Sequence, residues 1–113
     1  MKHKVISATL ASCLCMGSFT ALADSHGMTT MQLAEEKKCM GCHTTSEELP
    51  RVPSFPSIAQ RYTMEEYDRL VQVVLTGGED HWGSAKMPEM DARAEVSQEE
   101  AEKLVTWIFD MKE

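Results

Sequence analysis

Two cysteines and a histidine fall within five consecutive residues, Cys39-Met40-Gly41-Cys42-His43. In a helical turn, a spacing of three residues places both thiols on the same side. Each thiol can then add to one vinyl group of a haem and form a thioether, while the adjacent imidazole reaches the iron as an axial ligand. The run C-x-x-C-H is the attachment motif of a c-type haem. We therefore expect one haem, covalently bound through Cys39 and Cys42, with His43 on the iron.

Other chemistry for this cysteine pair fits the sequence less well. A redox-active C-x-x-C is expected beside a βαβ unit, and the sequence shows no pattern of alternating strands. A structural zinc site requires four ligands, whereas the other two cysteines, Cys13 and Cys15, lie in a segment that we expect to be removed. A disulfide between Cys39 and Cys42 would leave His43 without a role.

The N-terminus is organised like a secretory signal peptide. Residues 2–4 are Lys-His-Lys, and residues 5–23 carry no charge and end in the small-residue pattern A-x-A. We expect cleavage after Ala23. The chain then divides into a signal peptide, residues 1–23, and an exported domain, residues 24–113.

Two alternatives for the N-terminal segment stay open. Residues 5–23 are long enough for an uncleaved membrane anchor, although their serine, threonine and glycine content makes them polar for a span. Residues 10–13, Leu-Ala-Ser-Cys, resemble a bacterial lipobox, which would place a lipid on Cys13. Cleavage is the expected outcome, so we expect no stable membrane insertion of the mature domain.

The chain is acidic, with 18 Asp and Glu residues against 11 Lys and Arg residues and a formal net charge of −7. Cleavage removes Lys2 and Lys4, which brings the exported domain to about −9. This charge disfavours nucleic acid and anionic membrane surfaces as partners. It favours a protein partner with a basic patch, bound more slowly as salt rises. Most individual acidic residues need no role beyond solubility.

Residues 24–113 are enough for one domain with a modest core. The whole chain has only three Phe, two Trp and two Tyr. A covalently bound haem would supply a large apolar body around which such a chain can fold.

Three helix starts are predicted by capping boxes, in which Ser or Thr is followed three residues later by Glu or Gln. They occur at Thr29, Thr63 and Ser97. The first helix is expected to continue into Cys39, and the second to end at the glycine pair 77–78. Apolar residues with helical spacing define one buried face on each of the other two helices. These faces comprise Tyr67, Leu70, Val71 and Val74 in the second helix and Ala101, Leu104, Val105 and Ile108 in the third.

The segments between these helices are expected to be mostly irregular. Residues 49–56 contain three prolines and predict an extended loop, with a short helical turn over residues 57–62. Residues 77–96 begin with two glycines and predict a long loop. The expected fold is all-α, with helices at both ends of the domain and long loops between them.

Four segments together resemble the short bacterial class I cytochromes c, and the resemblance covers essentially the whole exported domain. They are the C-x-x-C-H motif at residues 39–43, the Pro-Ser-Phe run at 53–55, the Gly-Gly…Trp-Gly…Met-Pro stretch at 77–88, and the final helix at 100–108. The resemblance implies the cytochrome c fold, in which the N- and C-terminal helices cross around one haem. It also implies a periplasmic location and a methionine of the intervening loop as the sixth iron ligand.

Four residues are candidates for that sixth ligand: His81, Met87, Met90 and Met111. We expect Met87, because it precedes Pro88 and stands five residues after a Trp, as in the family. A thioether sulfur favours ferrous iron, so a His/Met pair gives a fairly high reduction potential. Met90 ranks next and His81 third, while Met111 is expected to serve packing in the last helix.

Two more site residues follow from the resemblance. The backbone carbonyl of Pro53 is expected to accept the Nδ1–H of His43 and so orient the imidazole, although Val52 stands where the family usually has a glycine. The Trp82 indole can only donate and is expected to bind a haem propionate, with a plain aromatic lid as the alternative. The propionate-binding arginine of some family members is not matched here, and Arg51 is interpreted as a solvated loop charge.

The predicted ligands determine the predicted function. With His43 and Met87 both bound, the iron has no free position for a substrate, and the sequence shows no nucleophile–base set. We therefore predict a monomeric electron carrier rather than an enzyme. A haem subunit of an oxidoreductase complex is the first alternative. A five-coordinate gas-binding haem protein is the second, and it requires that Met87 does not bind.

Overall fold

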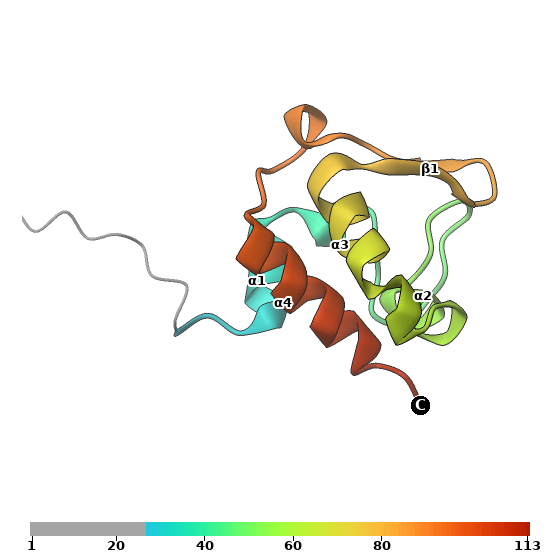
Figure 1. Cartoon of the computed structure of the whole chain (residues 1–113), viewed down its shortest axis with the longest axis horizontal. Helices are drawn as coiled ribbons and strands as arrows, with labels where there is room; N and C mark the ends of the chain where they lie inside the picture. Colours follow the sequence, from blue (N-terminus) through green and yellow to red (C-terminus); the bar gives the residue numbers. More distant parts are fainter. Residues whose placement is uncertain (1–26) are drawn as a thin grey trace, which may run out of the picture.

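Four α-helices and one β-hairpin form the part of the chain that the computed structural model describes, residues 27–113 (Figure 1). The helices are α1 (Thr30–Glu36), α2 (Phe55–Arg61), α3 (Tyr67–Thr76) and α4 (Gln98–Phe109). The strands are β1 (Gly78–Trp82) and β2 (Ala85–Met87), and short 3₁₀ turns cover Cys39–Gly41, Met64–Glu66 and Met90–Ala92. The described part is mostly helical, as the sequence predicts.

The predicted signal peptide, residues 1–23, lies outside the described residues, together with Cys13, Cys15 and His26. The division into a signal peptide and a domain at residues 24–113 therefore stays a prediction. Within residues 27–113, no helix is long and apolar enough to cross a membrane.

All three predicted capping boxes are present. The Thr29 hydroxyl accepts from the Gln32 N–H at 3.2 Å, and the Gln32 side chain accepts from the Thr29 N–H at 2.9 Å. The boxes at Thr63 and Ser97 have the same reciprocal geometry. A cap of this kind stabilises a helix start by about 1 kcal/mol, so the starts of α1 and α4 are set locally. The Thr63 box instead caps the 3₁₀ turn Met64–Glu66, and α3 begins only at Tyr67, later than the sequence predicts.

Helix α4 lies at the centre of the packing and contacts α1, α2 and α3 (Figure 1). Its four predicted inner residues are all buried: Ala101, Leu104, Val105 and Ile108. Ala34 of α1 and Ala101 of α4 have no exposed surface and belong to the same apolar cluster, together with Leu70 and Val71 of α3. Small side chains let two helices approach closely, so α1 and α4 form the predicted crossing of terminal helices.

The first helix is shorter than the sequence predicts. It ends at Glu36 rather than at Cys39, and the Lys38 N–H bonds to the Glu35 carbonyl at 3.0 Å, which tightens the last turn. Lys38 then adopts a left-handed conformation with φ 64°. This reverses the chain direction, so the cysteine motif forms a separate turn.

The extended loop predicted for residues 49–56 ends two residues earlier than expected, at Ser54. Helix α2 begins at Phe55, two residues earlier than expected, with the Ser54 hydroxyl accepting from the Ser57 N–H at 3.2 Å. Pro56 lies in the first helical turn, where a missing N–H costs nothing because that position has no intrahelical partner.

The segment from 77 to 96 is not the simple loop that the sequence predicts. Strands β1 and β2 pair antiparallel, with Gly78 opposite Met87 and Trp82 opposite Ala85. The turn between them contains Gly83 at φ 59°, a conformation that favours glycine. The sequence analysis missed this two-residue hairpin turn, which fixes where Met87 lies.

Candidate functional site

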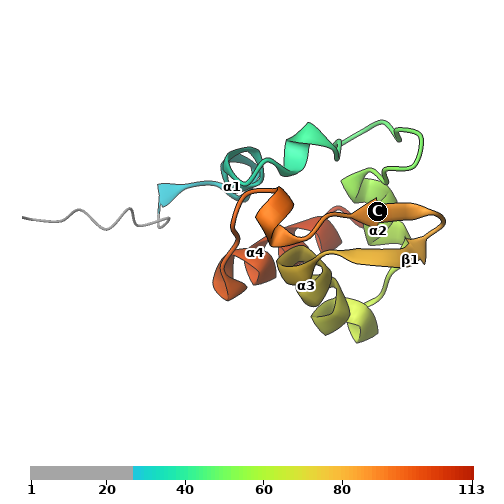
Figure 2. The ribbon, with the colours of Figure 1, turned by 90° about the horizontal axis from the view of Figure 1, so that it is seen from above.

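A cavity of about 460 Å³ lies between the segment that follows α1 and helix α3, which occupy opposite edges of the molecule in Figure 2. Its walls also include residues of α2, α4 and the hairpin, and they are mostly apolar. Cofactor sites commonly enclose roughly 300–1,000 Å³ with apolar walls and a few polar groups. Helices α2, α3 and α4, the hairpin and the segment after α1 therefore contribute to one site of cofactor size.

The cysteine motif forms a tight turn on the wall of this cavity. The backbone N–H groups of Cys42 and His43 both donate to the Cys39 carbonyl, at 3.2 and 2.9 Å. Both thiols are free, and both cysteines and His43 line the cavity. Burial raises the pKa of the Cys39 thiol against the opposing positive charge of Arg93. The turn thus brings two thiols and an imidazole to one side, as the motif spacing predicts.

The His43 imidazole is held from two sides. Its Nδ1 lies 2.8 Å from the Pro53 carbonyl oxygen, so this nitrogen carries the proton and donates. The ring stacks on Phe55 with centroids 5.1 Å apart, and Phe55 in turn packs edge-on against Trp107 at 5.2 Å. Burial lowers the pKa of His43, and the bond to Pro53 opposes that shift. The neutral imidazole, which is the form that binds metals, is therefore favoured.

Met87, at the end of β2, lines the same cavity as His43. The other two methionine candidates are also in the described part of the chain, but neither lines the cavity. Met90 packs against the main apolar cluster, and Met111 packs against a second cluster formed by Phe55, Ala59 and Ile108. His81 lies in β1, and its side chain is outside the described part.

Comparison with known proteins agrees with this geometry. A family model described as cytochrome C oxidase, cbb3-type, subunit III matches residues 27–108. Cytochrome c-551 of Allochromatium vinosum is 30% identical over 97 residues, which cover 83% of this chain and 99% of that protein. The chain belongs to the class I cytochrome c family.

Two further relatives support the assignment of this cytochrome. Cytochrome c2 of Rhodocyclus tenuis is 30% identical over 84 residues, covering 72% of this chain and 90% of that protein. The crystal structure of wild-type cytochrome c552 from Nitrosomonas europaea matches with a TM-score of 0.63 and 26% identity, covering 73% of this chain and 99% of that chain. The predicted cytochrome c fold is therefore confirmed.

The site of this cytochrome fits its cofactor, a covalently bound haem c. Cys39 and Cys42 are the cysteines of the attachment motif, and they border an apolar cavity with an oriented, neutral imidazole beside them. Across residues 27–113, no group of three or more His, Cys, Asp or Glu side chains is arranged to hold a metal ion. The two motif thiols and the oriented imidazole are the groups that attach a haem and bind its iron.

Trp82 is half-buried in the cavity wall of this cytochrome, and the Arg61 guanidinium lies over its ring. The Arg61 guanidinium lies 4.6 Å from the Trp82 ring centroid, and the Tyr62 ring lies 6.4 Å from it. Arg51, interpreted from sequence as a solvated charge, is exposed but also lines the cavity. Some family members have a propionate-binding arginine in the helix that corresponds to α3. In this chain the apolar Val73 lines the cavity from that helix.

The sequence analysis missed Arg93, which also lines the cavity. Its Nε donates to the Pro88 carbonyl at 2.8 Å, and its Nη2 donates to the Val74 carbonyl. The available signal was a single basic residue in the otherwise acidic stretch that follows Met87. Its two acceptors lie in different elements, so local patterns could not identify them.

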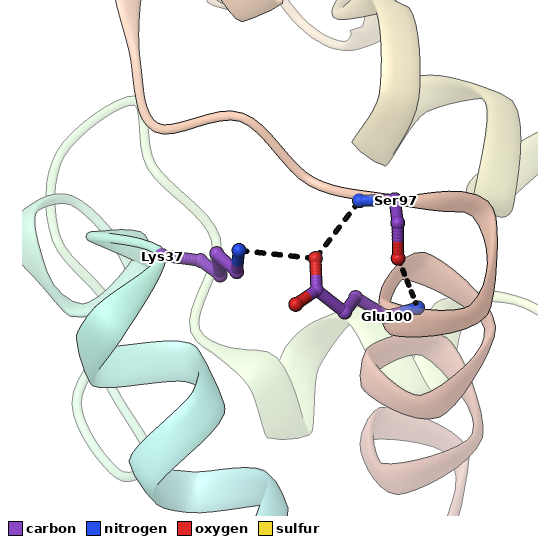
Figure 3. A network of polar contacts seen from close by, with 3 residues as sticks. All are labelled: Lys37, Ser97 and Glu100. Atoms are coloured by element: carbon purple, nitrogen blue, oxygen red, sulfur yellow. Dashed lines mark hydrogen bonds and ion pairs between the residues drawn. The ribbon is translucent and has the colours of Figure 1, made fainter. Parts of the chain in front are cut away.

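A second missed group joins the crossing helices beside the cysteine turn (Figure 3). Lys37 Nζ lies 3.0 Å from Glu100 Oε2, and the same oxygen accepts from the Ser97 N–H at 2.9 Å. The two side chains of the ion pair are only 16% and 19% exposed. Burial would raise the pKa of Glu100, but hydrogen bonds from Ser97 and the charge of Lys37 hold it below its usual range. The cap of α4 is thereby tied to the end of α1.

Proposed function

We propose that this cytochrome is a periplasmic electron carrier whose iron is bound by His43 and Met87. The observation that carries this proposal is that His43 and Met87 line the same cavity, whereas Met90 and Met111 pack elsewhere. When bound, the haem supplies a redox centre that takes up and releases one electron.

The side chains around the cavity have distinct proposed roles. Cys39 and Cys42 hold the cofactor covalently, and Pro53 fixes the imidazole of His43 so that its other nitrogen is free to bind iron. The soft sulfur of Met87 favours the ferrous state and so a higher reduction potential. The Trp82 indole N–H is available to bind a propionate, because indole can only donate. The apolar walls exclude water.

Two protein ligands leave the iron no open position, so electron transfer is favoured over catalysis. We propose that residues 24–113 act as a monomer after cleavage behind Ala23. The net charge of −7 for the whole chain supports a redox partner with a basic docking patch and disfavours nucleic acid. Salt should therefore slow electron transfer between them.

A haem subunit of an oxidoreductase complex is the second candidate. It is favoured by the description of the matching family model, an oxidase subunit. A carrier exchanges partners and elutes alone from a sizing column at physiological salt. Stable co-elution with a larger redox protein would favour the subunit.

Carbon monoxide binding to the ferrous protein tests the Met87 assignment. If the sulfur is bound, the wild type is low-spin and binds the gas slowly, whereas Met87→Ala binds it fast and has a lower reduction potential. Met90→Ala is the matched control, because the same side chain is removed three residues away, and it should behave like the wild type. A silent Met87→Ala together with a high-spin Met90→Ala would move the ligand to Met90. Fast binding by the wild type would overturn both assignments and favour a gas-binding protein.

A further inference from the structure

Arg93 joins two segments that border the cavity at different points in the chain. Its Nε donates to the carbonyl of Pro88, the residue directly after Met87, at 2.8 Å, and its Nη2 donates to the carbonyl of Val74. The side chain is half-buried and lines the cavity. One guanidinium therefore connects the candidate ligand strand to α3.

The Val74 carbonyl is a natural acceptor for this cation. It lies in the last turn of α3, where the final four carbonyls have no intrahelical partner. The Gly77 N–H bonds to the Val73 carbonyl, so Val74 is left for another donor. A cation at this end also interacts favourably with the helix dipole. Arg93 thus completes the end of α3 while it holds Pro88.

The backbone of Met87 and Pro88 also lies close to Gly77. Gly77 has φ 79°, and a Cβ there would lie 2.7 Å from the Met87 carbonyl oxygen and 2.9 Å from the Pro88 carbonyl carbon. Pro88 has no N–H of its own, so its carbonyl is the backbone group by which a side chain can hold it. The close approach of Gly77 to both carbonyls and the hydrogen bond from Arg93 to the Pro88 carbonyl together leave this backbone little freedom.

We propose that Arg93 is a positioning residue that keeps the Met87 sulfur in the cavity by bridging the Pro88 and Val74 carbonyls. The inference rests on the proposed ligation by Met87. Arginine suits this task because its planar fork presents several donors in fixed directions, whereas a lysine ammonium offers one point of attachment. Arg93 donates to the carbonyls of Pro88 and Val74, so it acts on the sulfur through the backbone next to Met87.

The test compares Arg93→Leu and Arg93→Lys with the wild-type holoprotein well below the melting temperature. Two readouts are used: the rate of carbon monoxide binding to the ferrous protein, and the weak long-wavelength absorption band given by methionine bound to ferric haem. We expect Arg93→Leu to bind carbon monoxide about tenfold faster or more, because a charge-assisted hydrogen bond is lost at each carbonyl and leucine adds no new ligand to the cavity. Arg93→Lys retains the charge but not the fork, and should fall between Arg93→Leu and the wild type.

The control is Arg69→Leu, which removes the same charge from an exposed position of α3 and should leave both readouts at wild-type values. If Arg93→Leu and Arg93→Lys bind as slowly as the wild type and keep the absorption band, the positioning role is wrong while Met87 stays the ligand. If the wild type itself binds fast and lacks the band, Met87 is not the ligand, and both proposals are overturned. If Arg93→Leu does not fold, Arg93→Lys alone decides between these outcomes.

Discussion

The two sides of the haem site are held by different means. On the attachment side, α1 and α4 cross through buried apolar side chains, with Ala34 and Ala101 at 0% exposure and Val105 at 1%. On the other side, Met87 lies in a hairpin whose described side chains are half-buried or exposed. Where that hairpin ends, the Met87 and Pro88 carbonyls lie close to Gly77, and the Pro88 carbonyl accepts a hydrogen bond from the Arg93 side chain. Damage to the crossing should therefore lower the stability of the fold, whereas damage to the hairpin should release the ligand first.

The largest expected effect comes from breaking the attachment itself. Cys39→Ser combined with Cys42→Ser removes both thioethers, so we expect no haem to remain with the chain. The apolar cavity of about 460 Å³ would then lose its contents, and most of the protein should fail to fold. Haem staining after a denaturing gel measures the attachment. Haem that survives on the double variant, or that extracts from the wild type into acidified solvent, would contradict the covalent link.

The next effect tests how much the buried packing of the crossing contributes to stability. Leu104 of α4 is 3% exposed, and Leu104→Ala should cost about 2–5 kcal/mol of unfolding free energy. Leu75→Ala in α3 is the matched control, because the half-buried Leu75 side chain only borders the core and should cost less. Urea titration of the holoprotein measures both. Equal losses would mean that the crossing contributes no more to stability than the edge of the core.

The sequence could predict the features of the molecule that depend on contacts between residues close together in the chain. The starts of α1 and α4 were predicted because Thr29 and Ser97 bond only three residues along the chain. The cysteine motif was predicted for the same reason, since its turn is closed by bonds within residues 39–43. The acceptor of the His43 proton, Pro53, came from the family resemblance, because the two residues are ten positions apart in the sequence.

What the sequence missed depends on contacts between distant segments. Arg93 bonds to a carbonyl 19 residues away, and Lys37 pairs with Glu100 across the helix crossing. The early end of α1 depends on the left-handed conformation of Lys38, for which lysine has no local preference. These contacts and this conformation depend on how α1, α3 and α4 pack together. Hydrophobic periodicity and capping motifs therefore cannot predict them.

A smaller effect is expected at Gly77, and it should appear in ligation before stability. Gly77→Ala places a Cβ 2.7 Å from the Met87 carbonyl oxygen at a backbone φ of 79°, so the Met87–Pro88 peptide must move. We expect a loss of about 1–3 kcal/mol together with faster carbon monoxide binding by the ferrous protein. Gly27→Ala is the control, because Gly27 has no positive φ and a Cβ there would meet no atom within 4 Å. Slow binding by Gly77→Ala, despite lowered stability, would show that this contact supports only the fold.

The smallest effect concerns the ion pair at the crossing and depends on pH. The pKa of Glu100 is lowered in the folded chain, so its stabilisation is complete above the ordinary glutamate pKa of about 4.3. As the pH falls, the unfolded chain takes up the proton first, and the contribution is lost as the pH passes through the folded pKa. Glu100→Gln keeps an acceptor for the Ser97 N–H but loses the attraction to Lys37, so it should cost about 1 kcal/mol at neutral pH and little in acid.

Urea titrations at neutral pH and at pH values below the glutamate range measure this difference directly. Glu99→Gln is the matched control, since its i,i+4 pair with Lys103 lies on the surface, with the Glu99 side chain 70% exposed. It should cost only a few tenths of a kcal/mol and respond to added salt more strongly than Glu100→Gln. If the two variants respond alike to acid and to salt, the Lys37–Glu100 pair is an ordinary surface contact. The crossing would then be held by apolar packing alone, which would make the contrast with the hairpin sharper.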